Sequence, residues 1–258
     1  MTTQYDLAKY GGLRGKRVFV TGGGSGIGET IVAAFAEQGA RVGFVDIATD
    51  ASLALCESVG AAGHAKPVFR QCDIRDISAL QQAMRSIAEE IGDFDVLVNN
   101  AGNDERHKPE DVTLEYWNDR IAINERPMFF TIQAVIDGMK KKGGGSIINI
   151  GSISWHISGG GFPVYTTAKA SVSGLTRGMA RDLGPFNIRV NTVTPGWVMT
   201  ERQRKLWVND EAEEEIKRSQ CLPGHLLPWH IARMVLFLAS DDSVMCTAQE
   251  FIVDAGWS

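Results

Sequence analysis

Residues Arg17 to Gly28 read Arg-Val-Phe-Val-Thr-Gly-Gly-Gly-Ser-Gly-Ile-Gly, an apolar run that passes directly into a glycine-rich turn. The run predicts a buried strand over Arg17–Thr21, and the residues beyond the turn predict a helix over Ile27–Gln38. Glycines at such a junction allow a tight turn and let the backbone approach a pyrophosphate, to which the helix N-terminus offers N–H donors. A glycine-rich turn alone is also compatible with an ordinary loop, so its place between strand and helix is what favours a nucleotide site.

An acidic residue ends the next predicted strand, Arg41–Asp46. Asp46 follows Gly28 by 18 residues, about where a ribose-binding carboxylate belongs. A carboxylate there hydrogen-bonds the ribose 2′-hydroxyl and repels a 2′-phosphate. Neither Ser25 nor Ile47 supplies a cation that would attract such a phosphate, so the sequence predicts NAD rather than NADP. The alternative for Asp46 is a solvated strand end.

Apolar, β-branched runs alternate with helical patterns along the rest of the chain. Further strands are expected at Val68–Cys72, Val96–Val98, Ser146–Ile150, Arg189–Val193 and Glu250–Val253, and further helices at Ser78–Ile91, Tyr165–Leu183 and Trp229–Ala239. This alternation implies βαβ units and an α/β fold, in which a doubly wound, seven-stranded parallel sheet has helices on both faces. Because no shift in composition divides residues 1–258, we expect a single domain.

The composition excludes several classes of function. With 44% apolar and 22% charged residues, the chain is ordinary for a soluble globular protein. A net charge of −5 argues against nucleic acid and membrane partners. There is no apolar run of about 18 residues, and polar Met1–Gly15 lacks the core of a signal peptide. Four separated cysteines fit a reduced, cytoplasmic protein, and the five histidines show no metal-ligand spacing. The cysteines are Cys56, Cys72, Cys221 and Cys246.

Tyr165 and Lys169 lie four residues apart in Tyr-Thr-Thr-Ala-Lys and therefore share one face of a predicted helix. A phenol with a pKa of about 10 is a poor base at neutral pH. An adjacent cation favours the phenolate and lowers that pKa. The pair is thus a candidate for proton transfer, although the same spacing also occurs on solvated helix faces.

The stretch from Trp197 to Leu227 breaks the alternation. It is long, charged and rich in large side chains, and Glu211–Gln220 has the pattern of an amphipathic helix. An insertion between a strand and the next helix is often an active-site lid. We expect a substrate lid at about 197–227, with a surface helix that has no role in binding as the alternative.

Together these motifs resemble the short-chain dehydrogenase/reductase family over essentially the whole chain, which implies a single-domain Rossmann fold. The matching segments are Gly22-x-x-x-Gly26-x-Gly28, Asp73, Asn99-Asn100-Ala101-Gly102, and Pro195-Gly196 followed by Val198 and Thr200. In the family, Asp73 corresponds to the position that usually holds the adenine amino group, and the last segment to the one that binds the nicotinamide carboxamide. The cofactor residues expected in this way are Gly22, Ser25, Gly26, Ile27, Gly28, Asp46, Ile47, Asp73, Ile74, Asn100, Ala101, Gly102, Tyr165, Lys169, Pro195, Gly196, Val198 and Thr200.

By the same resemblance, Asn124, Ser152, Tyr165 and Lys169 fall where the catalytic tetrad of the family is expected. Tyr165 would be the base in oxidation and the acid in reduction, and Lys169 would lower its pKa and bind the nicotinamide ribose. Ser152 would orient the reacting oxygen. Asn124 would hold a water that links Lys169 to solvent.

Pro127 gives this last role a physical basis. Inside a helical segment it cannot donate a hydrogen bond to the carbonyl of Ile123, so the helix ladder is interrupted beside Asn124. The alternative is a simple packing kink.

A closer resemblance is to bacterial sugar 1-dehydrogenases of the D-xylose type, through Asn99–His107, Gly151–His156 and the ending Asp254–Trp257. It implies oxidation of an aldose such as D-xylose or L-arabinose at C1 to the lactone. Candidate sugar ligands lie on segments that follow strand ends, where ligands bind in such sheets. They are Asn103, Asp104, Arg106, His107, Ser154, Trp155, His156, Trp197, Met199 and Gln203, of which Asn103, Trp155, His156 and Trp197 are favoured.

Two alternatives remain open at this point. One is another NAD(H)-dependent alcohol dehydrogenase, or a ketone or 3-oxoacyl reductase, of the same family. The other is a catalytically inactive nucleotide-binding regulator, against which the intact Ser152, Tyr165 and Lys169 argue. The resemblance also implies a homotetramer assembled through the helices that contain Asn124 and Tyr165, and a small polar substrate.

Overall fold

The structure is a computed structural model that describes residues 8–258, so part of the N-terminal segment considered above lies outside the described residues. Seven parallel strands form one sheet in the order β3-β2-β1-β4-β5-β6-β7. Their bounds are β1 Arg17–Thr21, β2 Arg41–Asp46, β3 Val68–Gln71, β4 Val96–Asn99, β5 Gly145–Ile150, β6 Ile188–Pro195 and β7 Glu250–Val253. The predicted doubly wound parallel sheet is confirmed.

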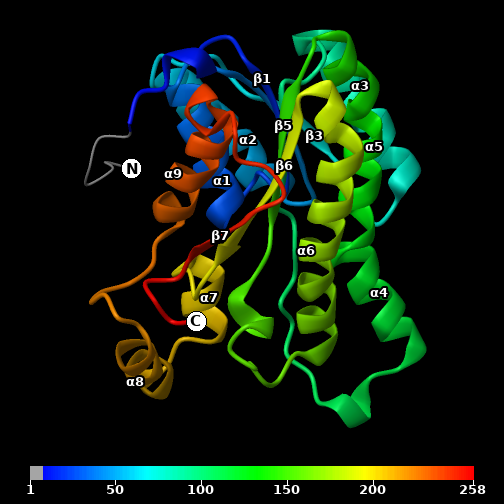
Figure 1. Cartoon of the computed structure of the whole chain (residues 1–258). Helices are drawn as coiled ribbons and strands as arrows, with labels where there is room; N and C mark the ends of the chain where they lie inside the picture. Colours follow the sequence, from blue (N-terminus) through cyan, green and yellow to red (C-terminus); the bar gives the residue numbers. More distant parts are fainter. Residues whose placement is uncertain (1–7) are drawn as a thin grey trace.

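Helices cover both faces of the sheet (Figure 1). Their bounds are α1 Gly26–Glu37, α2 Thr49–Ala61, α3 Ile77–Ile91, α4 Leu114–Asn124, α5 Arg126–Lys141, α6 Pro163–Leu183, α7 Glu201–Leu206, α8 Asp210–Ser219 and α9 Pro228–Ala239. One face is covered by α1, α2 and α9, and the other by α3, α5 and α6.

The pattern of buried residues explains why these helices pack on the sheet. In α3 the buried residues are Leu80, Met84, Ile87 and Ile91, which fall on one stripe of the helix. The Asp76 carboxylate accepts a hydrogen bond from the backbone N–H of Ala79 at 3.0 Å and so caps the start of the helix. In contrast β1 is buried along Val18–Thr21, as expected for a central strand covered on both faces.

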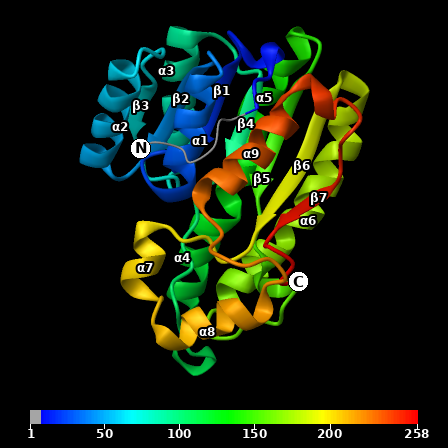
Figure 2. The same ribbon diagram turned by 90° about the vertical axis from the view of Figure 1, so that its left-hand side faces the viewer.

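The chain reverses its direction of travel across the sheet between β1 and β4, which are hydrogen-bonded neighbours. Ligands bind at such a switch point, outside the carboxyl ends of the strands. At this end of the sheet α7 and α8 project beyond the body of the fold, and α4 extends to the same level (Figure 2). The predicted amphipathic helix in the insertion is therefore present as α8. Among residues 8–258, no helix is long and apolar enough to span a membrane.

Candidate active site

A cavity of about 1390 Å³ runs along the carboxyl edge of the sheet. Its walls come from the turns after β1, β2 and β4, the ends of β3 and β5, helix α6, and the segment from β6 through α7. All the residues expected at the cofactor site line this cavity: Gly22, Ser25, Gly26, Ile27, Gly28, Asp46, Ile47, Asp73, Ile74, Asn100, Ala101, Gly102, Tyr165, Lys169, Pro195, Gly196, Val198 and Thr200. The tertiary fold thus brings segments from across the whole chain to one cleft.

The glycine turn at Gly22–Gly28 requires glycine at specific positions. Gly22 has a φ of +66°, and a Cβ on Gly28 would lie 1.8 Å from the carbonyl oxygen of Gly22. Asn100 stabilises the turn, because its Nδ2 donates to the carbonyls of Thr21 at 3.1 Å and Gly22 at 2.9 Å. Ser25, at the N-cap of α1, makes no side-chain capping bond, so it leaves the N–H groups of the first turn free for an anion.

Asp46 lies at the end of β2 and holds the glycine turn against the start of α2. Its Oδ2 accepts from the N–H of Gly24 at 2.8 Å, and its Oδ1 accepts from the N–H of Ala48 at 2.8 Å. The neighbouring Ile47 is 68% exposed on the cavity wall. The carboxylate therefore sits fixed on the cavity wall beside an apolar side chain, with no basic side chain next to it in the sequence.

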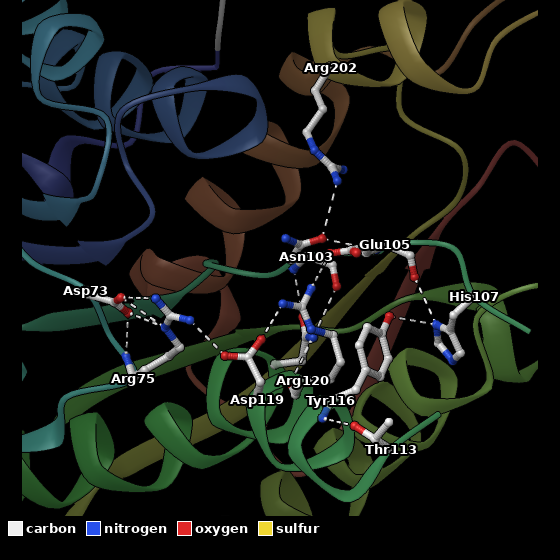
Figure 3. Close-up of polar contacts among 11 residues, drawn as sticks. Asp73, Arg75, Asn103, Glu105, His107, Thr113, Tyr116, Asp119, Arg120 and Arg202 are labelled. Carbon is white, nitrogen blue, oxygen red and sulfur yellow. Dashed lines mark hydrogen bonds and ion pairs between the residues drawn. The ribbon is translucent and has the colours of Figure 1, made fainter. Parts of the chain in front are cut away.

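Asp73 is part of a chain of charged groups (Figure 3). It pairs with Arg75, whose Nη1 also contacts Asp119 at 2.7 Å, and the hydrogen bond from Arg75 lowers the pKa of Asp73. Asp119 in turn pairs with the buried Arg120, which donates to Glu105 Oε2 at 2.8 Å. Charges thus connect the end of β3 with the loop that follows β4, on the same side of the cavity.

Burial dominates the acidity of Tyr165. Loss of solvation raises the pKa of the phenol, and the Asp104 carboxylate raises it further. A hydrogen bond with Ser152 and the charges of Arg106 and Arg202 act in the opposite direction. Desolvation thus outweighs the nearby cations, and the lowering of the Tyr165 pKa by Lys169 stays a prediction.

Lys169 is buried beside Tyr165, with its Nζ 5.8 Å from the centre of the phenol ring. The Nζ donates to the carbonyl of Ile150 at 2.8 Å. Burial lowers the pKa of the Lys169 ammonium to about 8, against an opposing effect of Asp104. A Cβ on Gly102 would lie 3.4 Å from this Nζ and 3.3 Å from Oδ1 of Asn124, so the glycine lies between the two side chains.

Asn124 is fully buried at the end of α4 and holds the loop after β4. Its Oδ1 accepts from the N–H of Asn103 at 2.7 Å, and its Nδ2 donates to the carbonyls of Asn103 at 3.1 Å and Arg120 at 3.0 Å. The expected interruption is confirmed, since α4 ends at Asn124 and α5 begins at Arg126 with Pro127 in its first turn. The water-holding role of Asn124 stays a prediction.

The predicted substrate residues divide into two groups. The residues that line the cavity are Asn103, Asp104, Arg106, Ser154, Trp197, Met199 and Gln203, whereas His107, Trp155 and His156 do not line it. The short helix Ile153–Trp155 turns Ser154 inward, to 4% exposure, and leaves Trp155 36% exposed. His156 stacks on Trp155, with ring centres 3.7 Å apart, and its Nε2 lies 3.0 Å from Oε1 of Glu250 on β7.

The predicted lid is anchored to the loop after β4. Trp197 Nε1 donates to Gln203 Oε1 at 2.9 Å, and Gln203 Nε2 donates to Asp104 Oδ2 at 2.7 Å. Arg202 forms an ion pair with the same carboxylate and donates to Asn103 Oδ1 at 3.3 Å. Most of α7 forms part of the cavity wall, through Glu201, Arg202, Gln203, Lys205 and Leu206.

Several further residues line the cavity. They are Arg120, Phe162, Trp207, Glu215 and Trp257. Trp207 lies within the predicted lid, and Trp257 lies in the quoted C-terminal motif, with its ring centre 6.3 Å from that of Trp197. Both tryptophans could have been proposed from those motifs. Glu215 also lies within the predicted lid, whereas Arg120 and Phe162 have no comparable signal in the sequence.

Comparison with known proteins identifies the relatives of this chain. A family model described as enoyl-(acyl carrier protein) reductase matches residues 22–258. D-xylose 1-dehydrogenase of Caulobacter vibrioides is 52% identical over 97% of this chain and 98% of the relative. A probable galactose dehydrogenase of Rhizobium meliloti is 48% identical over 95% of each chain.

Solved structures agree with these sequence matches. A short-chain dehydrogenase/reductase from Serratia marcescens superposes with a TM-score of 0.89 at 36% identity, over 96% of this chain and 99% of that chain. A blue fluorescent protein from a metagenomic library, in complex with NADPH, has a TM-score of 0.88 at 35% identity, over the same shares of the two chains.

Proposed function

Because the chain belongs to the short-chain dehydrogenase/reductase family of nicotinamide-dependent oxidoreductases, we propose that it oxidises an aldose at C1 to the lactone with NAD⁺. D-xylose, L-arabinose or a similar sugar is the proposed substrate. One observation carries the proposal: the cavity that contains Tyr165 is lined at its substrate end by hydrogen-bonding groups and indole rings. The hydroxyl of Ser154 is buried there without a hydrogen-bond partner among residues 8–258. A hydroxylated ligand would supply that partner.

The residues of the cavity fit a dinucleotide. The tight glycine turn, in which Gly22 has a φ of +66°, and the first turn of α1, left uncapped by Ser25, suit a pyrophosphate. Asp46 would hold the adenosine ribose, Asp73 the adenine, and Lys169 the nicotinamide ribose. Asn100–Gly102 and Pro195–Thr200 would form the remaining walls around the nicotinamide end. Bound NAD⁺ would supply the acceptor for the hydride that leaves C1.

Asp46 supports the choice of NAD over NADP. Its two carboxylate oxygens are fixed by backbone N–H groups, and the neighbouring Ile47 and Ala48 carry no charge. A fixed carboxylate would accept from a ribose 2′-hydroxyl and would repel a 2′-phosphate. A solved relative contains NADPH, so the preference rests on these residues of the chain itself.

Each catalytic residue would have its own role in proton transfer. As C1 is oxidised, the C1 hydroxyl would give its proton to the phenolate of Tyr165, while Ser152 would hold the same oxygen. Lys169 would stabilise the phenolate through its charge, and Asn124 would keep the loop after β4 in place. A water held beside Asn124 would pass the proton on toward solvent.

Three further proposals accompany this function. The segment 197–227 would act as a substrate lid, supported by the bonds of Arg202 and Gln203 to Asp104. A homotetramer would cover exposed apolar side chains on α4 and α5, among them Leu114, Trp117 and Phe129. A cytoplasmic location would suit the four unpaired cysteines.

The test is the change in absorbance at 340 nm with NAD⁺ or NADP⁺ and a panel of pentoses, hexoses, simple alcohols and 3-oxoacyl thioesters. We expect NAD⁺-dependent oxidation of at least one aldose, and Tyr165→Phe should abolish it while NADH still binds. If no aldose is oxidised but a ketone is reduced with NADH, the sugar proposal is wrong. Turnover near the wild-type rate in Tyr165→Phe would exclude Tyr165 as the base.

A further inference from the structure

Arg106 lies among aromatic rings at the substrate end of the cavity. Its Cζ is 4.1 Å from the ring centre of Phe162, 5.3 Å from that of Trp207 and 6.0 Å from that of Trp197. The three rings come from the loop before α6, the segment after α7 and the segment after β6. A guanidinium stacked on an aromatic face keeps its plane fixed and leaves its N–H edge free to bind.

The hydrogen-bonding state of Arg106 differs from that of its basic neighbours. Arg120 and Arg202 are both paired with carboxylates. In the part of the chain that the structure describes, Arg106 forms no hydrogen bond and no ion pair, although it lines the cavity. Its N–H donors are therefore available to a ligand.

A second unpaired donor lies beside it. The indole Nε1 of Trp207 is buried and has no hydrogen-bond partner among residues 8–258, and Trp207 lines the same cavity. A buried donor without a partner costs about 1–3 kcal/mol. Arg106 and Trp207 thus bring donors without protein partners to the wall of one cavity, which favours a ligand with several acceptor oxygens.

The charges around Arg106 indicate that this ligand is neutral. Asp104 and Glu215 line the cavity with Arg106, as does Arg202, which is paired with Asp104. Two carboxylates therefore already balance two guanidinium groups. A carboxylate or phosphate ligand would add an uncompensated negative charge, whereas a hydroxylated ligand would not.

We propose that Arg106 is the specificity residue for the sugar hydroxyls remote from C1, to which its fork of N–H groups donates side by side. This inference rests on the proposed function. The ring of Phe162 contacts the guanidinium and also lies 5.8 Å from the ring of Tyr165, centre to centre. A sugar whose C1 meets Tyr165 therefore directs its far carbons toward Arg106 and Trp207.

The experiment compares Arg106→Met and Arg106→Lys with the control Arg85→Met. Arg85 is exposed on α3 and does not line the cavity. The probes are D-xylose or D-galactose, whichever the wild type oxidises better, and its 1,5-anhydro analogue, which lacks the anomeric hydroxyl and binds without reacting. Calorimetry with the cofactor-saturated enzyme gives the Kd of the analogue, and initial rates give kcat and KM.

Arg106→Met should raise both KM and the Kd of the analogue by about 10- to 100-fold, because hydrogen bonds to a charged donor are lost. Arg106→Lys should recover part of the loss, since it keeps the charge but not the fork. Arg85→Met should behave as the wild type. The wild type should bind 3-deoxy or 4-deoxy sugars more weakly than the parent sugar. In Arg106→Met this difference in affinity should largely vanish.

The outcomes separate this inference from the proposed function. If the wild type oxidises aldoses, but Arg106→Met binds the analogue within twofold of wild type or keeps the full difference in affinity for the deoxy sugars, the role of Arg106 is refuted and the aldose activity stands. If the wild type oxidises no aldose, the proposed function fails first. If Arg106→Met does not fold, Arg106→Lys and the affinities of the wild type for deoxy sugars serve as the test. Equal affinity of the wild type for the deoxy sugars and the parent sugar would then refute the inference.

Discussion

The Nε2 of His107 accepts a hydrogen bond from the backbone N–H of Val164 at 3.2 Å, one residue before Tyr165. Phe162, the N-cap residue of α6, makes no side-chain capping bond, so His107 satisfies this N–H from a distant loop. The Nδ1 of His107 lies 2.9 Å from the hydroxyl of Tyr116, and its backbone N–H donates to the carbonyl of Gly161 at 2.8 Å (Figure 3). The loop after β4 therefore holds the start of the helix that contains Tyr165 and Lys169.

His107→Ala should lower kcat/KM for the aldose about five- to tenfold, because loss of a capping bond costs roughly 1 kcal/mol and loosens the first turn of α6. The affinity for NADH should change little. Steady-state kinetics and NADH fluorescence measure the two effects. His107→Gln keeps an acceptor and should recover part of the activity. Wild-type activity in His107→Ala would show that the hydrogen bond of His107 to the start of α6 does not matter for catalysis.

Asp104→Asn should move the rise of aldose oxidation with pH toward lower pH. The base must be the phenolate, and burial and then the Asp104 carboxylate raise the pKa of Tyr165. Removal of the negative charge lowers that pKa, so the phenolate forms at lower pH. The pH profile of kcat/KM measures the shift. Asp137→Asn, on the exposed surface of α5, is the matched control and should leave the profile in place.

Lys169→Met should abolish oxidation and raise the free energy of unfolding of the ligand-free protein at pH 7. Burial lowers the pKa of Lys169 from 10.5 to about 8, so below pH 8 a buried charge destabilises the fold in full. Between pH 8 and 10.5 the unfolded state binds more protons than the folded state, and stability rises with pH. Denaturant unfolding at pH 7 and pH 9.5 should show this rise in the wild type relative to Lys169→Met. The same pH dependence in both proteins would contradict burial of the ammonium.

Asp46→Asn should reduce the preference for NAD⁺ over NADP⁺ by about tenfold or more, because it removes the charge that repels a 2′-phosphate. Asparagine keeps one acceptor oxygen for the N–H of Gly24 or Ala48, so the turn should persist better than in Asp46→Ala. The ratio of kcat/KM for the two cofactors measures the effect. Asp50→Asn, exposed on α2, is the control. An unchanged ratio in Asp46→Asn would mean that Asp46 does not contact the ribose.

The bounds of the strands depend partly on the local sequence pattern and partly on pairing with distant strands. Arg17–Thr21, Arg41–Asp46 and Glu250–Val253 have the bounds that the sequence predicts. The strand expected at Arg189–Val193 instead covers Ile188–Pro195. Its last residues, Thr194 and Pro195, pair with Ile252 and Val253 of β7. That pairing depends on a strand more than fifty residues away, so no local pattern could indicate it.

The site shows the same division. Motif residues that follow strand ends meet in one cleft, because the carboxyl ends of parallel strands share one edge of the sheet. The sequence could not tell that Ser154 faces the cavity while Trp155 and His156 turn away, since a single short helix decides the direction of each side chain. Glu250, which contacts the ring of His156, lies on β7, more than ninety residues further along the chain.

By itself the sequence determined the α/β class, the order of the elements, the nucleotide turn and the candidate proton-transfer pair, because periodicity and local chemistry are properties of neighbouring residues. Only the tertiary structure decided the environment of each group. It half-buried Tyr165 and fully buried Lys169, and the loss of solvation raises the pKa of the tyrosine and lowers that of the lysine. It also placed Arg106 among Phe162, Trp197 and Trp207 without a partner. Solvation and unmet hydrogen bonds depend on what surrounds a side chain in space, and those surroundings come from segments far apart in the chain.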